Sequence, residues 1–317
     1  MKVRILGCGG SFGSPLAWNK NGNIDVNNPK NHRTRSSVLI NINDQNLLID
    51  TSPDLRAQLY NARCTKIDAV LFTHEHSDHT SGLPDMRAIA LINKLIIPAF
   101  LSNDIKESMT RNYKYIFEGD KDYSPFMSVK TINDNFNIGN TTINTFKHNH
   151  GPIDVQTFRI NNFAYSTDLK NFYEKDIDKL KDLDLWIVGL LRYDPHPSHA
   201  GFDQINEYIK YLKPKRTLFT HMTALLDYAD VTRREIASGE SEKIDCIKGN
   251  VVVLEFGDPR CRITVRPSGT EPKIKFYVQW FVEARSDDLS DIEEQYEEMN
   301  EHIEVMSREL EGILFES

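Results

Sequence analysis

Residues 73–79 hold four candidate metal ligands, His74, His76, Asp78 and His79. The segment reads Thr-His-Glu-His-Ser-Asp-His and directly follows an apolar, strand-like run. Alternate residues of an extended segment point the same way, so His74 and His76 can bind one metal ion together. After the chain turns, Asp78 and His79 face a second position beside the first. Imidazole and carboxylate ligands suit zinc, manganese or iron, so the segment predicts a metal centre.

One motif supplies too few ligands for two metal ions, so we expect the remaining ligands further along the chain. His150, Asp168 and His221 each stand at the end of a strand-like run. Ligands at strand ends can converge on one sheet edge. A carboxylate such as Asp168 can bridge two cations held about 3.5–4 Å apart. His148 competes with His150 as the third ligand of the first ion. We favour His150, because the glycine after it permits close approach.

The elements that must position these residues alternate between strand and helix patterns, which favours a layered α/β architecture. Strands are predicted at 2–7, 36–42, 46–50, 68–73, 141–147, 155–160, 162–166, 184–189, 215–220, 250–256, 262–266 and 273–281. Helices are predicted near 54–62, 82–94, 103–117, 172–181, 202–212, 224–237 and 287–313. In the last helix, apolar residues from Leu289 to Ile313 recur at alternating steps of three and four and form one stripe.

The segment THEHSDHTSG, with the later His, Asp and His, resembles the metallo-β-lactamase superfamily of metallohydrolases. The segments GCGGSFGSP, NPKNHRTRSS and LLIDTSPDL resemble one branch in particular. It contains the phosphoribosyl cyclic phosphate phosphodiesterases and is related to the tRNA 3′-processing ribonucleases. The resemblance covers about residues 1–256. It implies a four-layer αββα sandwich with a dinuclear metal site at one edge.

The resemblance also implies a role for each site residue. One divalent ion would be held by His74, His76 and His150, the other by Asp78, His79 and His221, with Asp168 bridging. The ligands fit zinc and manganese equally. His199, in the segment 196–199, would be catalytic and donate a proton to the leaving oxygen; Asp78 is assigned as catalytic as well as a ligand. Asp50 would orient the metal loop from behind.

A second resemblance lies at the C-terminal end, where residues 266–273 read RPSGTEPK. This loop is similar to the loop that grips phosphate in the C-terminal domain of the phosphohexomutases (phosphoglucomutase and phosphomannomutase). The candidates for phosphate binding are Arg266, Ser268, Gly269 and Thr270. We find no phosphoserine loop and no Asp-rich magnesium loop in the sequence, so we do not expect mutase activity.

We therefore predict a hydrolase domain at 1–256 and a phosphohexomutase-like fragment at 257–317. The fragment is expected to be a small β/α appendage ending in the long helix. A passive appendage is the favoured interpretation, and a working phosphate clamp is the alternative. In the hydrolase domain, Arg33 and Arg35 could meet a substrate phosphate, but a solvated basic loop fits them equally well.

Composition sets further limits. The formal net charge is −8 over 317 residues, but thirteen acidic residues and only two arginines lie after residue 280, so the rest is slightly basic. This leaves an anionic substrate compatible with the main domain. The four cysteines are scattered without a C-x-x-C pair, which argues against a disulfide framework or a cysteine-based zinc site. We find no apolar run long enough to span a bilayer and no signal-like start, so we expect a cytoplasmic protein without a membrane partner.

These observations predict a phosphodiesterase that cleaves a small cyclic or nucleotide-like phosphate diester through a metal-bridging hydroxide. A nuclease resembling ribonuclease Z would share every ligand but would need a long basic groove or arm, which the sequence does not show. Nucleic acid is therefore the less favoured substrate. A non-catalytic phosphate-binding or sensing protein is the third hypothesis, and thioester or lactam hydrolysis is a further one. A homodimer is compatible with the sequence.

Overall fold

The structure is a computed structural model that divides into two compact units, Met1–Tyr228 and Ala229–Ser317. All the predicted metal ligands lie in the first unit. The residues that the structure describes are 1–18, 22–122, 124–228, 252–256, 258–267, 274–279, 295–298, 300–301 and 303. Within them, no helix combines the length and the apolar character that crossing a bilayer requires.

The first sheet has six strands in the order β1 to β6, with β1–β2 and β2–β3 antiparallel and the other pairs parallel. Asn43 and Asp44 join β2 to β3 with φ angles of 48° and 58°, the two-residue turn that suits a twisted hairpin. The strands are β1 (Lys2–Gly7), β2 (Ser37–Ile42), β3 (Gln45–Ile49), β4 (Ala69–Leu71), β5 (Ile97–Leu101) and β6 (Met127–Thr131).

The second sheet has seven strands in the order β11-β8-β9-β10-β12-β13, with β7 paired to β8. Strands β10, β12 and β13 run parallel, so their C-terminal ends meet at one edge. The strands are β7 (Asn135–Ile138), β8 (Thr141–His150), β9 (Ile153–Ile160), β10 (Phe163–Ser166), β11 (Asn171–Phe172), β12 (Leu185–Gly189) and β13 (Thr217–Thr220).

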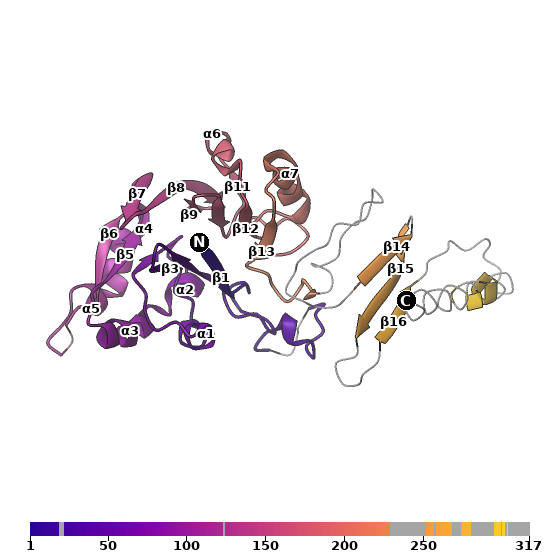
Figure 1. The fold of residues 1–317 in the computed structure, drawn as a ribbon, viewed down its shortest axis with the longest axis horizontal. Coiled ribbons are helices and arrows are strands. Elements are labelled where there is room, and N and C mark those ends of the chain that lie inside the picture. The colour runs from indigo at the N-terminus through magenta and orange to yellow at the C-terminus, as the bar shows by residue number, and fades with distance from the viewer. Residues whose placement is uncertain are drawn as a thin grey trace. The chain divides into compact units, whose positions relative to one another are not determined.

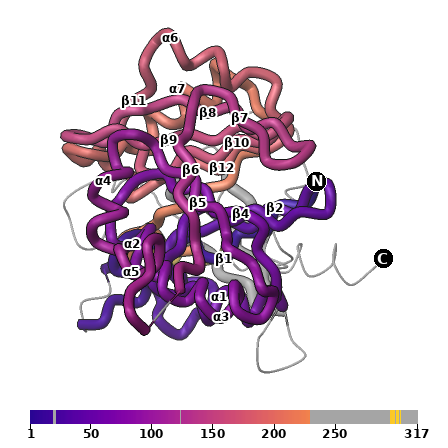
Figure 2. The backbone as a smooth tube through the Cα atoms, turned by 90° about the vertical axis from the view of Figure 1, so that its left-hand side faces the viewer, coloured from indigo at the N-terminus to yellow at the C-terminus, as the bar shows by residue number. Residues whose placement is uncertain are grey.

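The two sheets pack face to face, with helices outside both of them (Figures 1 and 2). Alternation along β2 shows why: Ile40 packs toward the second sheet, whereas Leu39 packs toward the helices. On the far side, Phe202 of α7 contacts Phe219 of β13. The α-helices are α1 (Leu55–Ala62), α2 (Ser77–Thr80), α3 (Met86–Asn93), α4 (Asn103–Asn112), α5 (Lys114–Phe117), α6 (Glu174–Ile177) and α7 (Phe202–Leu212). The 3-10 helices are η1 (Pro29–Asn31), η2 (Leu83–Asp85) and η3 (Asp178–Leu180).

The predicted α/β sandwich of two sheets is confirmed, but the sequence patterns missed four of its strands: β5, β6, β7 and β11. Strand β5 contains Pro98, which argues against a strand interior, and β11 has only two residues. The sequence predicts a helix at 224–237. Residues 224–225 form a turn instead, and most of the remaining range lies outside the described residues.

The second unit contains an antiparallel sheet of β14 (Val252–Phe256), β15 (Asp258–Pro267) and β16 (Ile274–Gln279). Arg266 lies on β15 opposite Lys275 of β16, whereas Ser268, Gly269 and Thr270 lie outside the described residues. The long terminal helix is not shown: residues 295–298, 300–301 and 303 are helical, and the rest of 287–313 lies outside the described residues. The predicted boundary after residue 256 stays a prediction, although β14 pairs with β15 across it.

Gly82 lies against the backbone of Ser52, so we expect Gly82→Ala to destabilise the protein. A Cβ atom there would stand 2.0 Å from the backbone oxygen of Ser52. Such overpacking should lower the free energy of unfolding by about 2 kcal/mol, measured by urea denaturation. Gly10→Ala is the control, because its Cβ would meet its nearest neighbours at an ordinary 3.4 Å. Equal urea midpoints for wild type and Gly82→Ala would contradict this reasoning.

Candidate metal centre

The structure brings all seven predicted ligands, and His199 with them, to one edge of the sandwich. The structure holds four groups of three residues, and inside each group the ligand atoms lie within 4.8 Å of one another. Each group combines residues far apart in the chain. His74 and His76 follow β4, His150 ends β8, and His221 directly follows β13. The groups are His74–His76–His150, His74–His79–Asp168, Asp78–His79–His221 and His150–Asp168–His199.

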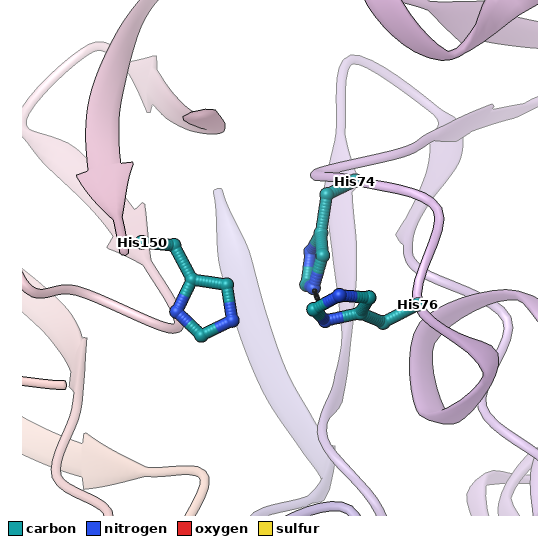
Figure 3. Close-up of side chains that lie close together, drawn as sticks. All are labelled: His74, His76 and His150. Carbon is teal, nitrogen blue, oxygen red and sulfur yellow. Dashed lines mark hydrogen bonds between the residues drawn. The ribbon is translucent and has the colours of Figure 1, made fainter. Parts of the chain in front are cut away.

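The first group is a triangle of imidazoles from two sheets. The rings of His74 and His76 stand on one side and the ring of His150 faces them from the other (Figure 3). Nε2 of His74 lies 2.9 Å from Nδ1 of His76, so both nitrogens can bind the same metal ion. Nδ1 of His150 donates to the carbonyl of Ser198 at 2.8 Å, which leaves Nε2 free to face the group. His76 is exposed, whereas His74 and His150 are buried.

The second group combines two imidazoles with a carboxylate. Oδ2 of Asp78 lies 3.1 Å from Nε2 of His221 and 3.3 Å from Nε2 of His79. Asp168 stands between the two groups: its oxygens lie 3.2 Å from His79 and from His221, and 3.8 Å from Nε2 of His150. A carboxylate that reaches ligands of both groups has the position that a bridge between two cations requires.

The donor atoms fit two divalent cations. Nε2 of His79 is buried and makes no hydrogen bond, although two carboxylates lie near it. A buried polar atom without a partner is costly unless something else satisfies it, and a metal ion shared with those carboxylates would do so. The set is made of imidazole and carboxylate donors only, which suits zinc or manganese.

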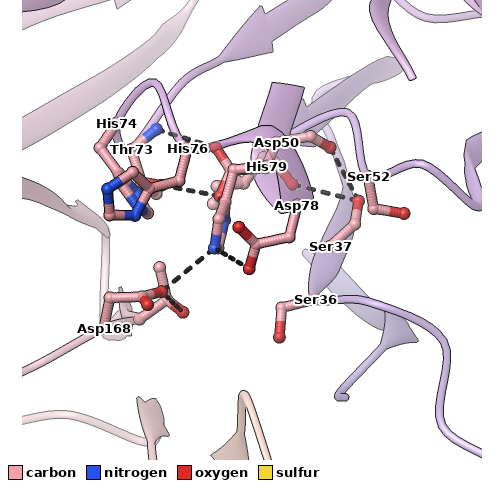
Figure 4. Close-up of polar contacts among 12 residues, drawn as sticks. Ser36, Ser37, Asp50, Ser52, Thr73, His74, His76, Asp78, His79 and Asp168 are labelled. Atoms are coloured by element: carbon pink, nitrogen blue, oxygen red, sulfur yellow. Dashed lines mark hydrogen bonds and ion pairs between the residues drawn. The ribbon is translucent and has the colours of Figure 1, made fainter. Parts of the chain in front are cut away.

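Asp50 is hydrogen-bonded to two residues of the metal-binding segment, Thr73 and His79 (Figure 4). Its Oδ2 accepts a hydrogen bond from Nδ1 of His79 at 2.7 Å, and it also accepts the hydroxyl of Thr73 at 2.8 Å. Its Oδ1 accepts the backbone N–H of Thr73, again at 2.8 Å. Asp50 is fully buried, so these bonds are shielded from water. Because Nδ1 of His79 is engaged in this way, its Nε2 is the nitrogen presented to the ligand group.

Burial and mutual charge set the protonation of the group. Burial lowers the pKa of His74, and the positive charge of His79 lowers it further. Burial alone would raise the pKa of the Asp168 carboxyl, but His221 and His79 outweigh it and hold this pKa well below its usual range. The neighbouring histidines likewise lower the pKa of Asp78. Neutral imidazole and ionised carboxylate are the forms that bind metal ions. Burial alone would lower the pKa of His79, but the carboxylates of Asp168 and Asp50 raise it well above its usual value, so His79 would lose a proton on binding a metal ion.

The backbone is strained at three site residues, each just beyond a strand end. Asp50, Asp168 and His221 have φ angles of 62°, 52° and 58°, in the left-handed region that side chains disfavour. Such positions cost about 1–3 kcal/mol each and persist where the surrounding structure enforces them. Gly189 lies beside Asp168. A Cβ atom on Gly189 would stand 2.8 Å from the backbone nitrogen of Asp168, so only a glycine lets the two backbones approach this closely.

His199 lies at the rim of the two groups. Its Nε2 is 3.9 Å from Oδ1 of Asp168, and its ring stacks on that of His221 at 5.4 Å and 17°. The ring of His150 is 4.7 Å away. Burial lowers the pKa of His199 to about 3, so the ring is neutral near pH 7 in the free protein. His196, the other histidine of this turn, is outside the four groups.

His148 lies away from the ligand groups, although it is as deeply buried as His74. Its Nε2 donates to the carbonyl of Thr167 at 2.7 Å, and its Nδ1 accepts the hydroxyl of Thr157 at 2.9 Å. Both ring nitrogens are therefore occupied. This geometry favours His150 over His148 as the ligand.

The two arginines considered for phosphate binding are engaged elsewhere. Arg33 is buried and donates to the carbonyls of Thr223 and Leu226 and to the side chain of Asn31. Its guanidinium therefore holds the segment after His221 in place through hydrogen bonds to that segment's carbonyls. Arg35 pairs with Asp54 at 3.3 Å.

The sequence patterns missed residues that act on the site through neighbours. Thr73 bonds Asp50, Ser198 accepts from His150, and Lys170 contacts the turn that carries His199. Thr73 and Ser198 adjoin predicted site residues, and that adjacency was the only signal for them. Lys170 follows Asp168 by two residues, but its partner, the carbonyl of His196, lies 26 residues further along the chain.

Comparisons with known proteins agree with this geometry. A family model described as the beta-lactamase superfamily domain matches residues 45–222. A solved structure described as a new diphosphatase from the PhnP family is 27% identical, with a TM-score of 0.67, and the match covers 74% of this chain and 91% of that one.

Two curated relatives are longer proteins. An octanoyltransferase of Porphyromonas gingivalis is 29% identical over 229 residues, covering 70% of this chain and 46% of that protein. A phosphoglucomutase of Staphylococcus epidermidis is 23% identical over 278 residues, covering 79% of this chain and 48% of that protein. The chain thus spans about half the length of each. The phosphoglucomutase is a distant homologue. Its match covers 79% of this chain and so extends well beyond the C-terminal region that resembles the phosphohexomutases.

Asp50→Asn should weaken metal binding without altering the fold. The amide keeps the shape of the carboxylate but removes the charge that faces His79. Loss of such an outer hydrogen bond typically lowers metal affinity about 10–100-fold. Titration of metal-free protein with zinc against a competing chelator measures the change. Asp54→Asn is the matched control, since Asp54 pairs with Arg35 outside the ligand groups. Wild-type affinity in Asp50→Asn would refute the role of Asp50.

His148 should make the protein acid-labile. Burial lowers its pKa from 6.5 to about 4, so between these values the unfolded chain binds a proton that the folded chain does not. Stability must then fall as the pH falls through this window, by about 3 kcal/mol in total. His148→Gln should flatten this slope in urea denaturation of metal-free protein, whereas His32→Gln, at an exposed histidine, should not. An unchanged slope in His148→Gln would contradict the assignment.

Proposed function

Since this chain belongs to the β-lactamase superfamily, we propose that it is a dinuclear metal-dependent phosphodiesterase acting on a small cyclic or nucleotide-like phosphate diester. The observation that carries the proposal is the pair of buried ligand groups with Asp168 between them. The family match and the ligand groups directly support a metal-dependent hydrolase of this fold.

In this proposal two of the four groups each hold one ion. His74, His76 and His150 would hold one ion, Asp78, His79 and His221 would hold the other, and Asp168 would serve both. Two zinc or manganese ions bound there would activate water and polarise the phosphoryl oxygens. Asp50 fixes the orientation of His79 through its short hydrogen bond.

The protein's own groups supply the remaining chemistry. Nε2 of His199 lies at the rim of the site, where it can donate a hydrogen bond or a proton to the leaving oxygen. The ring is neutral in the free protein, and a phosphate diester brings the negative charge that favours its protonated form. Because the ligands other than His76 are buried, access to the site is from the side of His76.

The phosphate substrate is supported by the resemblance to the cyclic phosphate phosphodiesterase branch. The similar solved structure is named a diphosphatase, and at 27% identity over 91% of its length it supports phosphate ester chemistry for this chain as well. The phosphate-binding role of Arg266, Ser268, Gly269 and Thr270 stays a prediction, as does the division into domains at residue 256. The distant phosphoglucomutase match supports homology with that family without assigning an activity.

Hydrolysis of bis(p-nitrophenyl) phosphate and of diphenyl phosphate by metal-reconstituted protein tests the proposal. Asp168→Ala should lower turnover of both at least about 100-fold, because it removes the contact common to both ligand groups. His199→Ala should affect diphenyl phosphate more, since phenolate is the more basic leaving group and needs a proton. Removal of metal by a chelator should abolish both activities.

His32→Ala is the control for loss of a histidine, because His32 is exposed and stands outside both the ligand groups and the turn of His199. It should keep nearly wild-type turnover. If wild-type protein binds two metal ions but hydrolyses no phosphate diester, the phosphodiesterase assignment is wrong.

A further inference from the structure

The turn that carries His199 is a tight hairpin that is hydrogen-bonded to other parts of the chain. The N–H of His196 donates to the carbonyl of His199 at 3.0 Å, and the N–H of His199 donates back at 3.3 Å. Only Pro197 and Ser198 lie between them. The carbonyl of Ser198 accepts from His150. The ring of His196 also contacts Ser198 inside the turn. These internal bonds set the shape of the turn, whereas bonds to other parts of the chain set its position in the site.

Lys170 makes the contact that reaches both ends of this turn. Its ammonium donates to the carbonyl of His196 at 2.6 Å and lies 3.5 Å from the carbonyl of His199. Hydrogen bonds from a charged donor are stronger than those between neutral groups. The side chain is half-buried, which limits competition from water.

The backbone of Lys170 is itself anchored to the site. Its N–H donates to the carbonyl of Asn149, the residue before His150. Its carbonyl accepts from the side chain of Gln204 in α7. Lys170 also lies two residues after Asp168. One residue therefore links the strand of His150, the loop of Asp168 and the turn of His199.

We propose that Lys170 is a positioning residue that holds His199 over the reacting groups. The inference rests on the proposed function, in which His199 serves the leaving oxygen. The ammonium is directed at backbone carbonyls, so it sets the place of the turn and does not contact the substrate. Proton transfer depends on reach within a hydrogen-bond distance, so a small displacement of the ring weakens this step selectively.

Lys170→Met tests the inference, because it keeps an unbranched side chain and removes the charge. With diphenyl phosphate, kcat should fall about 10–100-fold, as expected when a proton donor is misplaced. With bis(p-nitrophenyl) phosphate, whose leaving group departs without a proton, kcat should change less than about 3-fold. KM should stay unchanged for both. Lys170→Arg should recover part of the lost kcat, because it restores a charged donor.

Lys179→Met is the matched control for loss of a paired lysine, since Lys179 bonds Asp176 away from the turn. It should retain wild-type kinetics with both esters. In the double variant Lys170→Met/His199→Ala, the loss on diphenyl phosphate should equal that of His199→Ala alone, because both changes act on one step.

Several outcomes would overturn the inference. A raised KM with both esters would mean that Lys170 contacts the substrate. Equal losses of kcat on both, with lower metal content, would mean a merely structural role. A crystal structure of Lys170→Met with the 196–199 turn unmoved would refute it whatever the activity. If His199→Ala discriminates between the esters and Lys170→Met does not, only this inference fails; if His199→Ala does not discriminate, the proton-donor role itself fails.

Discussion

The buried carboxylate of Asp168 is the interaction on which the rest of the site depends. It is 2% exposed and lies 3.2 Å from imidazoles that come from different sheets. Asp50 and Asp78 also supply negative charge to His79, but only Asp168 lies between the two ligand groups. The imidazole rings are crowded there, since the ring centroids of His74 and His79 are 4.3 Å apart. A buried carboxylate is tolerated only when it is paired, and here the paired histidines are the ligand groups themselves. The sheets are thus joined at this edge by charge as well as by apolar packing.

Gathering these groups imposes costs on the chain around them. The left-handed backbone at Asp50, Asp168 and His221 is unfavourable for residues with a Cβ atom, yet all three face the site from strand ends. The apolar contacts between the sheets, from Ile40 to Phe158, supply the stability that enforces this geometry. Strain of this kind concentrates where side chains must be held in place before a ligand arrives.

Polar contacts from outside the ligand groups hold three of the ligands in place. Asp50 orients the ring of His79, and the Ser198 carbonyl orients the ring of His150. The Ser36 hydroxyl holds His221 through its backbone N–H. Each supporting group comes from a different part of the chain. The turn of His199 belongs to the same system, since it supplies the carbonyl that orients His150 and receives the ammonium of Lys170. Ligand orientation and the place of the candidate proton donor are therefore coupled.

The sequence by itself determined the features that depend on local spacing. His74, His76, Asp78 and His79 lie within six residues, so their convergence follows from strand and turn geometry. Alternating apolar residues likewise predicted most strands and the layered α/β class. By contrast, β5 escaped prediction, because burial between parallel neighbours overrides the local preference of Pro98.

The tertiary structure alone decided the questions that depend on where a sheet ends. His148 and His150 are two residues apart on one strand, so both point to the same side, and in the sequence only the glycine after His150 distinguishes them. Strand pairing sets His148 opposite Val155 inside the sheet, where Thr157 and Thr167 satisfy its ring, and leaves His150 at the tip. The same holds for Lys170, whose partners lie across a connection that no local pattern describes. Contacts between residues distant in sequence arise from packing, and only the folded chain reveals them.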